Sequence, residues 1–195
     1  EEEILLHQAA KNAFDEMGAV DVRQRERDAD GIGLVRSEFL YMECNEMPSE
    51  ESLYEAYKKC VCRMGGKRVI IRTLDIGADK PLPYLDLGHE ENPAIGFRAI
   101  RVCQKKPELF ADQLRAILRA SAHGKVSIMF PMISGLPEFL EGKQAVLRCM
   151  DELRQKGVAF DEHVQIGMMI EVPAAAIMSD VLAQHADFFS IGTND

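Results

Sequence analysis

Short, mostly apolar runs alternate with amphipathic segments along most of this 195-residue chain. The runs lie at 31–36, 68–72, 126–132, 165–170 and 188–191, and their apolar residues are contiguous rather than alternating with polar ones. Strands that are buried on both faces have this pattern, which is typical of a parallel sheet covered by helices. The sequence therefore predicts an α/β fold with five strands.

Segments in which apolar residues recur at helical spacing separate the strands, at 49–64, 107–121, 137–156 and 173–184. Ser49 is a suitable N-cap for the first of them, and Pro107 and Pro173 suit the first turns of two others. A further helix is predicted over 1–17, and a loop rich in proline and glycine over 75–97. Because a closed (β/α)8 barrel has eight strands, the chain is expected to form either an open α/β sheet or part of a barrel.

The composition argues against several classes of protein. The net charge of −9 disfavours nonspecific nucleic-acid binding, which depends on clustered Lys and Arg. No apolar stretch approaches the roughly 20 residues of a membrane-spanning helix, so membrane insertion is not expected. The acidic start lacks the basic region of a signal peptide, and five cysteines, an odd number, favour a reducing compartment. The expected location is therefore the cytoplasm.

The cysteines are predicted to be free, buried or half-buried thiols. Cys60 and Cys62 form a close pair, but no second close pair accompanies them, so a structural zinc site is not expected. The complete set is Cys44, Cys60, Cys62, Cys103 and Cys149.

Charged and amide side chains follow the apolar runs at the points where the predicted strands end. They are Arg36, Arg72, Glu171, Asn194 and Asp195. Parallel α/β folds bind ligands beyond the carboxyl ends of their strands. Guanidinium groups match phosphate or carboxylate, and two carboxylates suit Mg²⁺ that shares its remaining positions with water and substrate oxygens. The pattern indicates a site for a Mg²⁺-bound anion, although a solvent-facing cap or a salt bridge could explain each charge taken alone.

Six long motifs resemble the C-terminal phosphoenolpyruvate-binding domain of the Enzyme I family, the phosphoenolpyruvate–protein phosphotransferases of the bacterial sugar phosphotransferase system. They are GLVRSEFLYM (33–42), IIRTLDIGADKPLPY (70–84), ENPAIGFRAIR (91–101), DQLRAILRASAHGKVSIMFPMI (112–133), IGMMIEVPAAA (166–176) and DFFSIGTND (187–195). The resemblance implies a (β/α)8 TIM barrel of the phosphoenolpyruvate/pyruvate type, incomplete here and reaching about the sixth strand. It implies a linker helix over 1–17 and the partial barrel over 18–195.

The same resemblance implies roles for individual residues. Arg36, Arg72, Arg98, Asn194 and Asp195 would contact phosphoenolpyruvate. Mg²⁺ is the implied cofactor, with Glu171 and Asp195 as its ligands. From the sequence pattern alone, Arg98 is equally well explained as a structural residue between a loop and a helix. The polar loop at 75–80 could close over the substrate or be a solvated connection.

The family's reaction transfers the phosphoryl group of phosphoenolpyruvate to a histidine of its own N-terminal domain and then to HPr for sugar uptake, leaving pyruvate. No catalytic residue is expected among these 195 residues, because the acid cysteine and the acceptor histidine have no counterpart in them. The histidines are predicted to be surface or packing residues; they are His7, His89, His123, His163 and His185. A homodimer is the expected assembly.

Two other interpretations remain open at this stage. A barrel of the pyruvate phosphate dikinase or phosphoenolpyruvate synthase type shares the arginine and carboxylate pattern but has a different acceptor. A non-catalytic module that binds ligand and dimerises would also account for a chain without the acid cysteine and the acceptor histidine.

Overall fold

The computed structural model describes residues 30–77 and 82–192. In these residues five parallel strands form one sheet, and the order of the strands in the sheet is their order in the sequence. The strands are β1 (Gly31–Arg36), β2 (Arg68–Arg72), β3 (Val126–Phe130), β4 (Gln165–Ile170) and β5 (Phe189–Ile191). The predicted α/β class and parallel sheet are confirmed, whereas the linker helix predicted over 1–17 lies outside the described residues.

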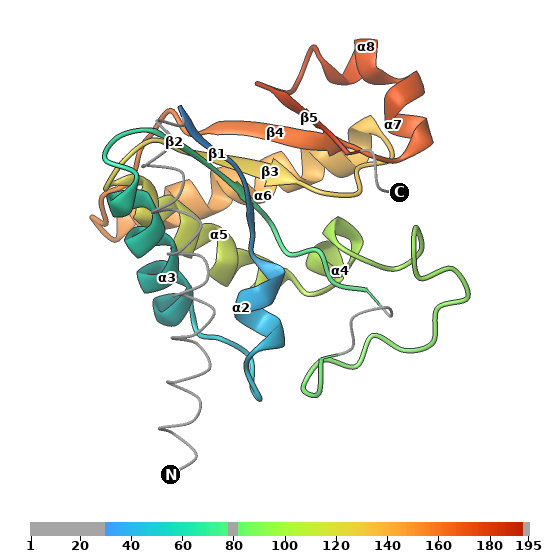
Figure 1. Ribbon diagram of the computed structural model, residues 1–195, viewed down its shortest axis with the longest axis horizontal. Helices are drawn as coiled ribbons and strands as arrows, with labels where there is room; N and C mark the ends of the chain where they lie inside the picture. Colours follow the sequence, from blue (N-terminus) through green and yellow to red (C-terminus); the bar gives the residue numbers. More distant parts are fainter. Residues whose placement is uncertain (1–29, 78–81, 193–195) are drawn as a thin grey trace.

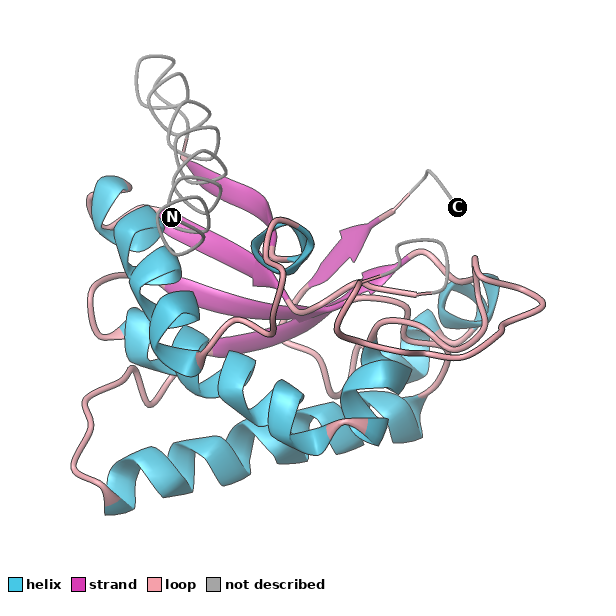
Figure 2. Ribbon diagram, turned by 90° about the horizontal axis from the view of Figure 1, so that it is seen from below, coloured by secondary structure: helices cyan, strands magenta, loops and turns pink. Residues whose placement is uncertain are grey.

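Helices fill the connections between the strands. They are α2 (Glu38–Met42), α3 (Glu50–Arg63), α4 (Ile100–Lys105), α5 (Pro107–Ser121), α6 (Leu136–Gln155), α7 (Pro173–Ile177) and α8 (Ser179–Leu182). Figures 1 and 2 show α3, α5 and α6 along one face of the curved sheet, where α5 packs between the other two. A curved parallel sheet with sequential strand order and helices on its outer face is the arrangement found in part of a TIM-type barrel.

The core lies between the sheet and this helical layer. All five residues of β3 are buried, which explains why its sequence is continuously apolar. Phe130 at the end of β3 packs edge-on against Phe139 of α6, with ring centroids 5.9 Å apart. Gly142 allows α6 to approach this ring, because a Cβ there would lie 2.9 Å from Phe130. The aromatic contacts thus fix the position of α6 on the sheet.

Four details differ from the sequence-based prediction. The third strand ends at Phe130 because Pro131 has no N–H for the ladder and Met132 has a φ of 59°. The helix predicted over 173–184 is divided at Met178, which has non-helical dihedrals. The short helices α2 and α4 were not predicted, because neither has a side-chain N-cap.

The predicted start of α3 is confirmed. The Ser49 hydroxyl accepts a hydrogen bond from the backbone N–H of Ser52 at 3.2 Å. Glu50 and Glu51 occupy the first turn, where carboxylates are stabilised by the helix dipole, and Gly65 with a φ of 59° follows the end.

Within the part of the chain that the structure describes, none of the helices has both the length and the apolarity needed to cross a membrane.

The surroundings of two strand glycines predict opposite effects of an added methyl group on the free energy of unfolding. A Cβ on Gly167 in β4 would lie 2.5 Å from the Phe188 carbonyl oxygen, and this backbone cannot yield easily. Gly33 in β1 has nothing within 4 Å of the equivalent position. Gly167→Ala should therefore lower the free energy of unfolding by about 1–3 kcal/mol through overpacking. Gly33→Ala, the matched control, should leave it unchanged or raise it by up to about 1 kcal/mol. Urea unfolding of both variants checks this, and equal effects would contradict it.

Candidate functional site at the carboxyl ends of the strands

The arginines that end β1 and β2 lie side by side. Arg36 is the register partner of Arg72, so the two side chains leave the same face of the sheet. A β-bulge between Ile32 and Val35 inserts one extra residue into β1 before this pair. Without that residue, the alternation of the strand would turn Arg36 to the opposite face. The bulge therefore matters for the site, since it brings two guanidinium groups to one edge.

Arg72 is buried between two carboxylates. Its Nη2 lies 2.7 Å from Oε1 of Glu38 and 3.1 Å from Oδ2 of Asp75. The residues are 5%, 2% and 5% exposed, respectively. Its Nη1 contacts the Met169 thioether at 3.9 Å, and its Nε has no hydrogen-bond partner among the described residues. Part of the guanidinium is thus anchored, and the rest keeps donors for an anion.

Asp75 joins this arginine to a second one. The other carboxylate oxygen, Oδ1, accepts hydrogen bonds from Nη2 and Nε of Arg98 at 2.9 and 3.3 Å. Nη1 of Arg98 donates to the carbonyls of Pro93 and Ala94, both at 3.2 Å. Glu38, Arg72, Asp75 and Arg98 consequently form a buried chain of alternating charge. Arg98, which sequence pattern alone could not assign, is part of the same network as Arg72.

The backbone next to Arg98 has an unusual conformation. Ala99 is fully buried with a φ of 50°, and its N–H donates to the Ile76 carbonyl at 2.9 Å. Such a conformation costs a non-glycine residue about 1–3 kcal/mol and persists only where the surroundings enforce it. The beginning of the loop predicted at 75–80 does not face solvent, because residues 75–77 are all buried. It is therefore no solvated connection at this end, while 78–80 lie outside the described residues.

Glu171 follows β4 directly and lies at the same edge of the sheet. Its Oε1 accepts the backbone N–H of Met132 at 2.6 Å, a contact that the positive φ of Met132 makes possible. A Cβ on Gly192 would lie 3.3 Å both from Oε2 of Glu171 and from Sδ of Met169. Met169, whose sulfur contacts Arg72, lies in β4 two residues before Glu171. Asn194 and Asp195 lie outside the described residues.

The side-chain chemistry of Glu171 suits Mg²⁺. The residues that the structure describes contain no cluster of three or more His, Cys, Asp or Glu side chains suited to a metal. Mg²⁺ needs no such cage, because it binds through one or two carboxylates and keeps several waters. Gly192 lies close against the half-buried Glu171, because a Cβ at this glycine would be 2.8 Å from the Glu171 Cβ. A half-buried carboxylate such as that of Glu171 is the type of donor that this ion prefers.

A buried amide connects the segments that carry the two anchoring carboxylates. Gln113 of α5 donates to the Ser37 hydroxyl at 3.0 Å and to the Tyr57 hydroxyl at 3.1 Å. Its carbonyl oxygen accepts the backbone N–H of Leu74 at 2.9 Å. Ser37 precedes Glu38 and Leu74 precedes Asp75, so one amide fixes both connections. Burial raises the pKa of Tyr57, which therefore stays a neutral hydroxyl partner.

The sequence analysis identified neither Glu38 nor Gln113. It also did not identify Asp75 as a partner of an arginine. Glu38 lies within a motif whose resemblance had been noted, but nothing local distinguishes it from a solvent-facing carboxylate. The one available signal was its position two residues after the strand-end arginine Arg36.

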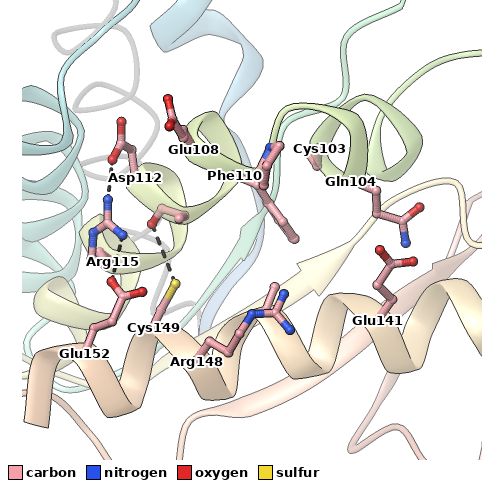
Figure 3. A pocket seen from close by; sticks show the side chains of 13 residues that line it. Cys103, Gln104, Glu108, Phe110, Asp112, Arg115, Glu141, Arg148, Cys149 and Glu152 are labelled. Atoms are coloured by element: carbon pink, nitrogen blue, oxygen red, sulfur yellow. Dashed lines mark hydrogen bonds and ion pairs between the residues drawn. The ribbon is translucent and has the colours of Figure 1, made fainter.

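A separate hollow of about 550 Å³ lies among α4, α5 and α6 (Figure 3). It is on the helical layer and none of the expected site residues lines it. Arg115 at its wall is already bonded to Glu50 and Glu152, at 2.7 and 2.9 Å. Burial raises the pKa of the Cys103 thiol to about 12 and that of Cys149 to about 11, so neither forms a reactive thiolate near neutral pH. The candidate site at the strand ends is therefore separate from this hollow.

All five cysteines are free, as predicted. The expected burial is confirmed for Cys44, Cys60, Cys103 and Cys149 but is wrong for Cys62, which is exposed on α3. His89, His123 and His163 are exposed and His185 is half-buried, in agreement with surface or packing roles, whereas His7 lies outside the described residues.

Residues 12–195 match the family model described as "PEP-utilising enzyme, PEP-binding domain". The chain is 54% identical over 167 residues to the phosphoenolpyruvate-protein phosphotransferase of Staphylococcus epidermidis, covering 86% of this chain and 29% of that protein. It is 52% identical over 170 residues to the protein of that name from Staphylococcus aureus, covering 87% and 30%. A Geobacillus stearothermophilus protein of the same name is 53% identical over 167 residues, covering 86% and 29%.

The fold, the strand-end arginines and this match together define the class of the protein. The chain belongs to the phosphoenolpyruvate-binding domain family of PEP-utilising enzymes. Its similar relatives carry the name phosphoenolpyruvate-protein phosphotransferase, in agreement with the resemblance found in the motifs. The chain spans about three tenths of the length of the curated relatives it matches.

Glu138 of α6 connects the segment that follows β3 with helix α4. Its Oε2 accepts both the N–H and the hydroxyl of Ser134 at 2.8 Å, and its Oε1 lies 3.0 Å from Nε of Arg101. Burial acts to raise the pKa of this carboxyl, but the Ser134 bonds and the Arg101 charge outweigh burial and lower it.

Glu138 should therefore stabilise the fold in a pH-dependent manner. A lowered folded-state pKa gives stability that is present above the unfolded value of about 4.3 and is lost as the pH falls through the folded value. Glu138→Gln should cost roughly 1.5–3 kcal/mol at pH 7 and progressively less below about pH 4. Urea unfolding across this pH range measures the cost of the substitution. The control is Glu55→Gln, which removes an exposed carboxylate that pairs with Lys58. A cost that does not change with pH would count against this account.

Proposed function

We propose that this chain is the phosphoenolpyruvate- and Mg²⁺-binding part of an Enzyme I-type phosphoenolpyruvate–protein phosphotransferase, a transferase of phosphorus-containing groups. The observation that carries the proposal is the edge formed by the strand ends. There Arg36 is the register partner of Arg72, and Arg72 is joined to Arg98 through Asp75 in a buried ion-pair network. The names of the relatives support this acceptor class over a dikinase or synthase.

The chemistry of these residues suits a phosphorylated enol acid. Arginine binds phosphate and carboxylate in bidentate fashion, and phosphoenolpyruvate has both groups on one small skeleton. Arg36, Arg72 and Arg98 would hold these groups with Asn194 and Asp195, while Glu171 and Asp195 would hold Mg²⁺. When bound, the ion neutralises charge on the phosphoryl oxygens. The arginines stabilise the charge that develops as the bridging P–O bond breaks and the enolate of pyruvate leaves.

The remaining parts of the proposal concern the longer protein. The phosphoryl group would pass to a histidine of an N-terminal domain and then to HPr, in a cytoplasmic homodimer that serves sugar uptake. Residues 1–17 would be the linker helix, and 18–195 would be part of a (β/α)8 TIM barrel of the phosphoenolpyruvate/pyruvate type. Ile191 of β5 is 78% exposed and Ile177 of α7 is 83% exposed. These exposures support the partial-barrel interpretation, since the next strand and helix of a barrel would cover both side chains.

Arg72→Ala should abolish most of the Mg²⁺-dependent binding of phosphoenolpyruvate. Removing the buried guanidinium takes away the donors that face the anion, and charge-assisted bonds contribute about 1.5–3 kcal/mol each, which is roughly a 10- to 100-fold loss of affinity per bond. Titration calorimetry measures the loss. Arg154→Ala, which removes an exposed arginine paired with Asp151 and Glu162, is the matched control and should bind normally. Unchanged affinity of Arg72→Ala would reject the site.

Glu171→Gln should raise the Mg²⁺ concentration that phosphoenolpyruvate binding requires. The amide keeps the size of the side chain but removes the charge that a hard cation requires. Calorimetry at increasing Mg²⁺ should show that the variant needs at least a tenfold higher concentration for half-maximal phosphoenolpyruvate affinity. Glu141→Gln on α6, which is exposed, should titrate like the wild type. An unaltered Mg²⁺ requirement in Glu171→Gln would exclude this residue as a ligand.

A further inference from the structure

Glu38 is a buried carboxylate beside the arginines at the strand ends. It is the first residue of α2, directly beyond β1, and its side chain is 3% exposed. Burying an ion pair costs desolvation energy that the attraction between the charges often fails to exceed, so a buried pair is weak evidence for stability. The pair with Arg72 has a short Nη2–Oε1 distance of 2.7 Å and lies at the edge where the ligand is proposed to bind.

The contacts divide the Arg72 guanidinium into two parts. Nη2 faces both carboxylates, at 2.7 Å from Glu38 and 3.1 Å from Asp75. Nη1 has the weak thioether contact to Met169, and Nε is buried with no partner among the described residues. A guanidinium anchored in this way cannot rotate freely, so its remaining donors point in a fixed direction.

The anchor is itself fixed by the fold. Ser37, the residue before Glu38, is fully buried and its hydroxyl accepts from Gln113 at 3.0 Å. Gln113 in turn accepts from the backbone of Leu74, which precedes the second anchor, Asp75. The direction of the Arg72 side chain is therefore determined from β1, β2 and α5 together.

We propose that Glu38 is a positioning residue that orients Arg72 for binding of the phosphorylated substrate. This inference rests on the proposed function. It has a distinctive consequence, because Glu38 is also a negative charge near an anion site. Loss of the charge alone would make the site more positive and strengthen anion binding, whereas loss of orientation weakens it. A residue with a purely structural role would change stability and leave affinity unaltered.

Glu38→Gln tests the sign of the effect in the full-length product of the gene that encodes this chain. Calorimetry with Mg²⁺ and phosphoenolpyruvate should show at least tenfold weaker binding. Glu50→Gln, which removes a carboxylate bonded to Arg115 and Arg119 in the helical layer, should bind like the wild type. Urea unfolding of both variants separates stability from affinity, and Glu38→Asp, which keeps the charge on a shorter side chain, should bind with intermediate affinity.

A double-mutant cycle identifies the residue through which Glu38 acts. If Glu38 works by orienting Arg72, then Glu38→Gln added to Arg72→Lys should cost much less than it costs alone. Equal or tighter binding by Glu38→Gln, or independent effects in the cycle, would overturn the inference while leaving the proposed function intact. Absence of phosphoenolpyruvate binding in the wild type would overturn the proposed function and the inference with it. If Glu38→Gln does not fold, Glu38→Asp with wild-type affinity would still refute the role.

Discussion

The buried chain of charges from Glu38 through Arg72 and Asp75 to Arg98 is the interaction on which the rest of the site depends. Each member is removed from water, so each needs a partner of opposite sign. The partners come from the connection after β1, the end of β2 and the long loop before α4. These segments, which are far apart along the chain, must therefore meet at one edge of the sheet for the ion pairs to form.

The two non-glycine residues with positive φ, among those described, are both at this edge. Ala99 follows Arg98, and the N–H of Met132 bonds to Glu171. Each conformation is strained by about 1–3 kcal/mol, which the packing around it must offset. Ala99 has no accessible surface and Met132 has very little, so the core enforces both conformations. The strained backbone conformations therefore lie in the connections beside charged groups, next to Arg98 and Glu171.

The sequence predicted the regular parts of the fold well because burial leaves a local signal. The bounds at 68–72, 107–121 and 165–170 agree with β2, α5 and β4, whose apolar residues face the core. Helices α2 and α4 lack such a signal, since they are one or two turns long and have no side-chain cap. The strand-end residues could be selected from sequence, because parallel strands bring their carboxyl ends together. Their partners could not, since Glu38 and Arg72 are 34 positions apart and their pairing exists only in the folded chain.

The exposure of the site residues indicates how an anion would enter. Arg36 is exposed and Arg72 is almost inaccessible, so these two neighbouring arginines place positive charge both at the surface and at the buried base of the candidate site. An anion would first meet Arg36 in water, where the attraction is weak, and would reach Arg72 only after losing part of its hydration. The buried arginine can compensate for that loss only if its free donors already have the right direction, because reorientation in a dry site would add to the cost. Burial of Arg72 and its anchoring by carboxylates are thus two aspects of one requirement.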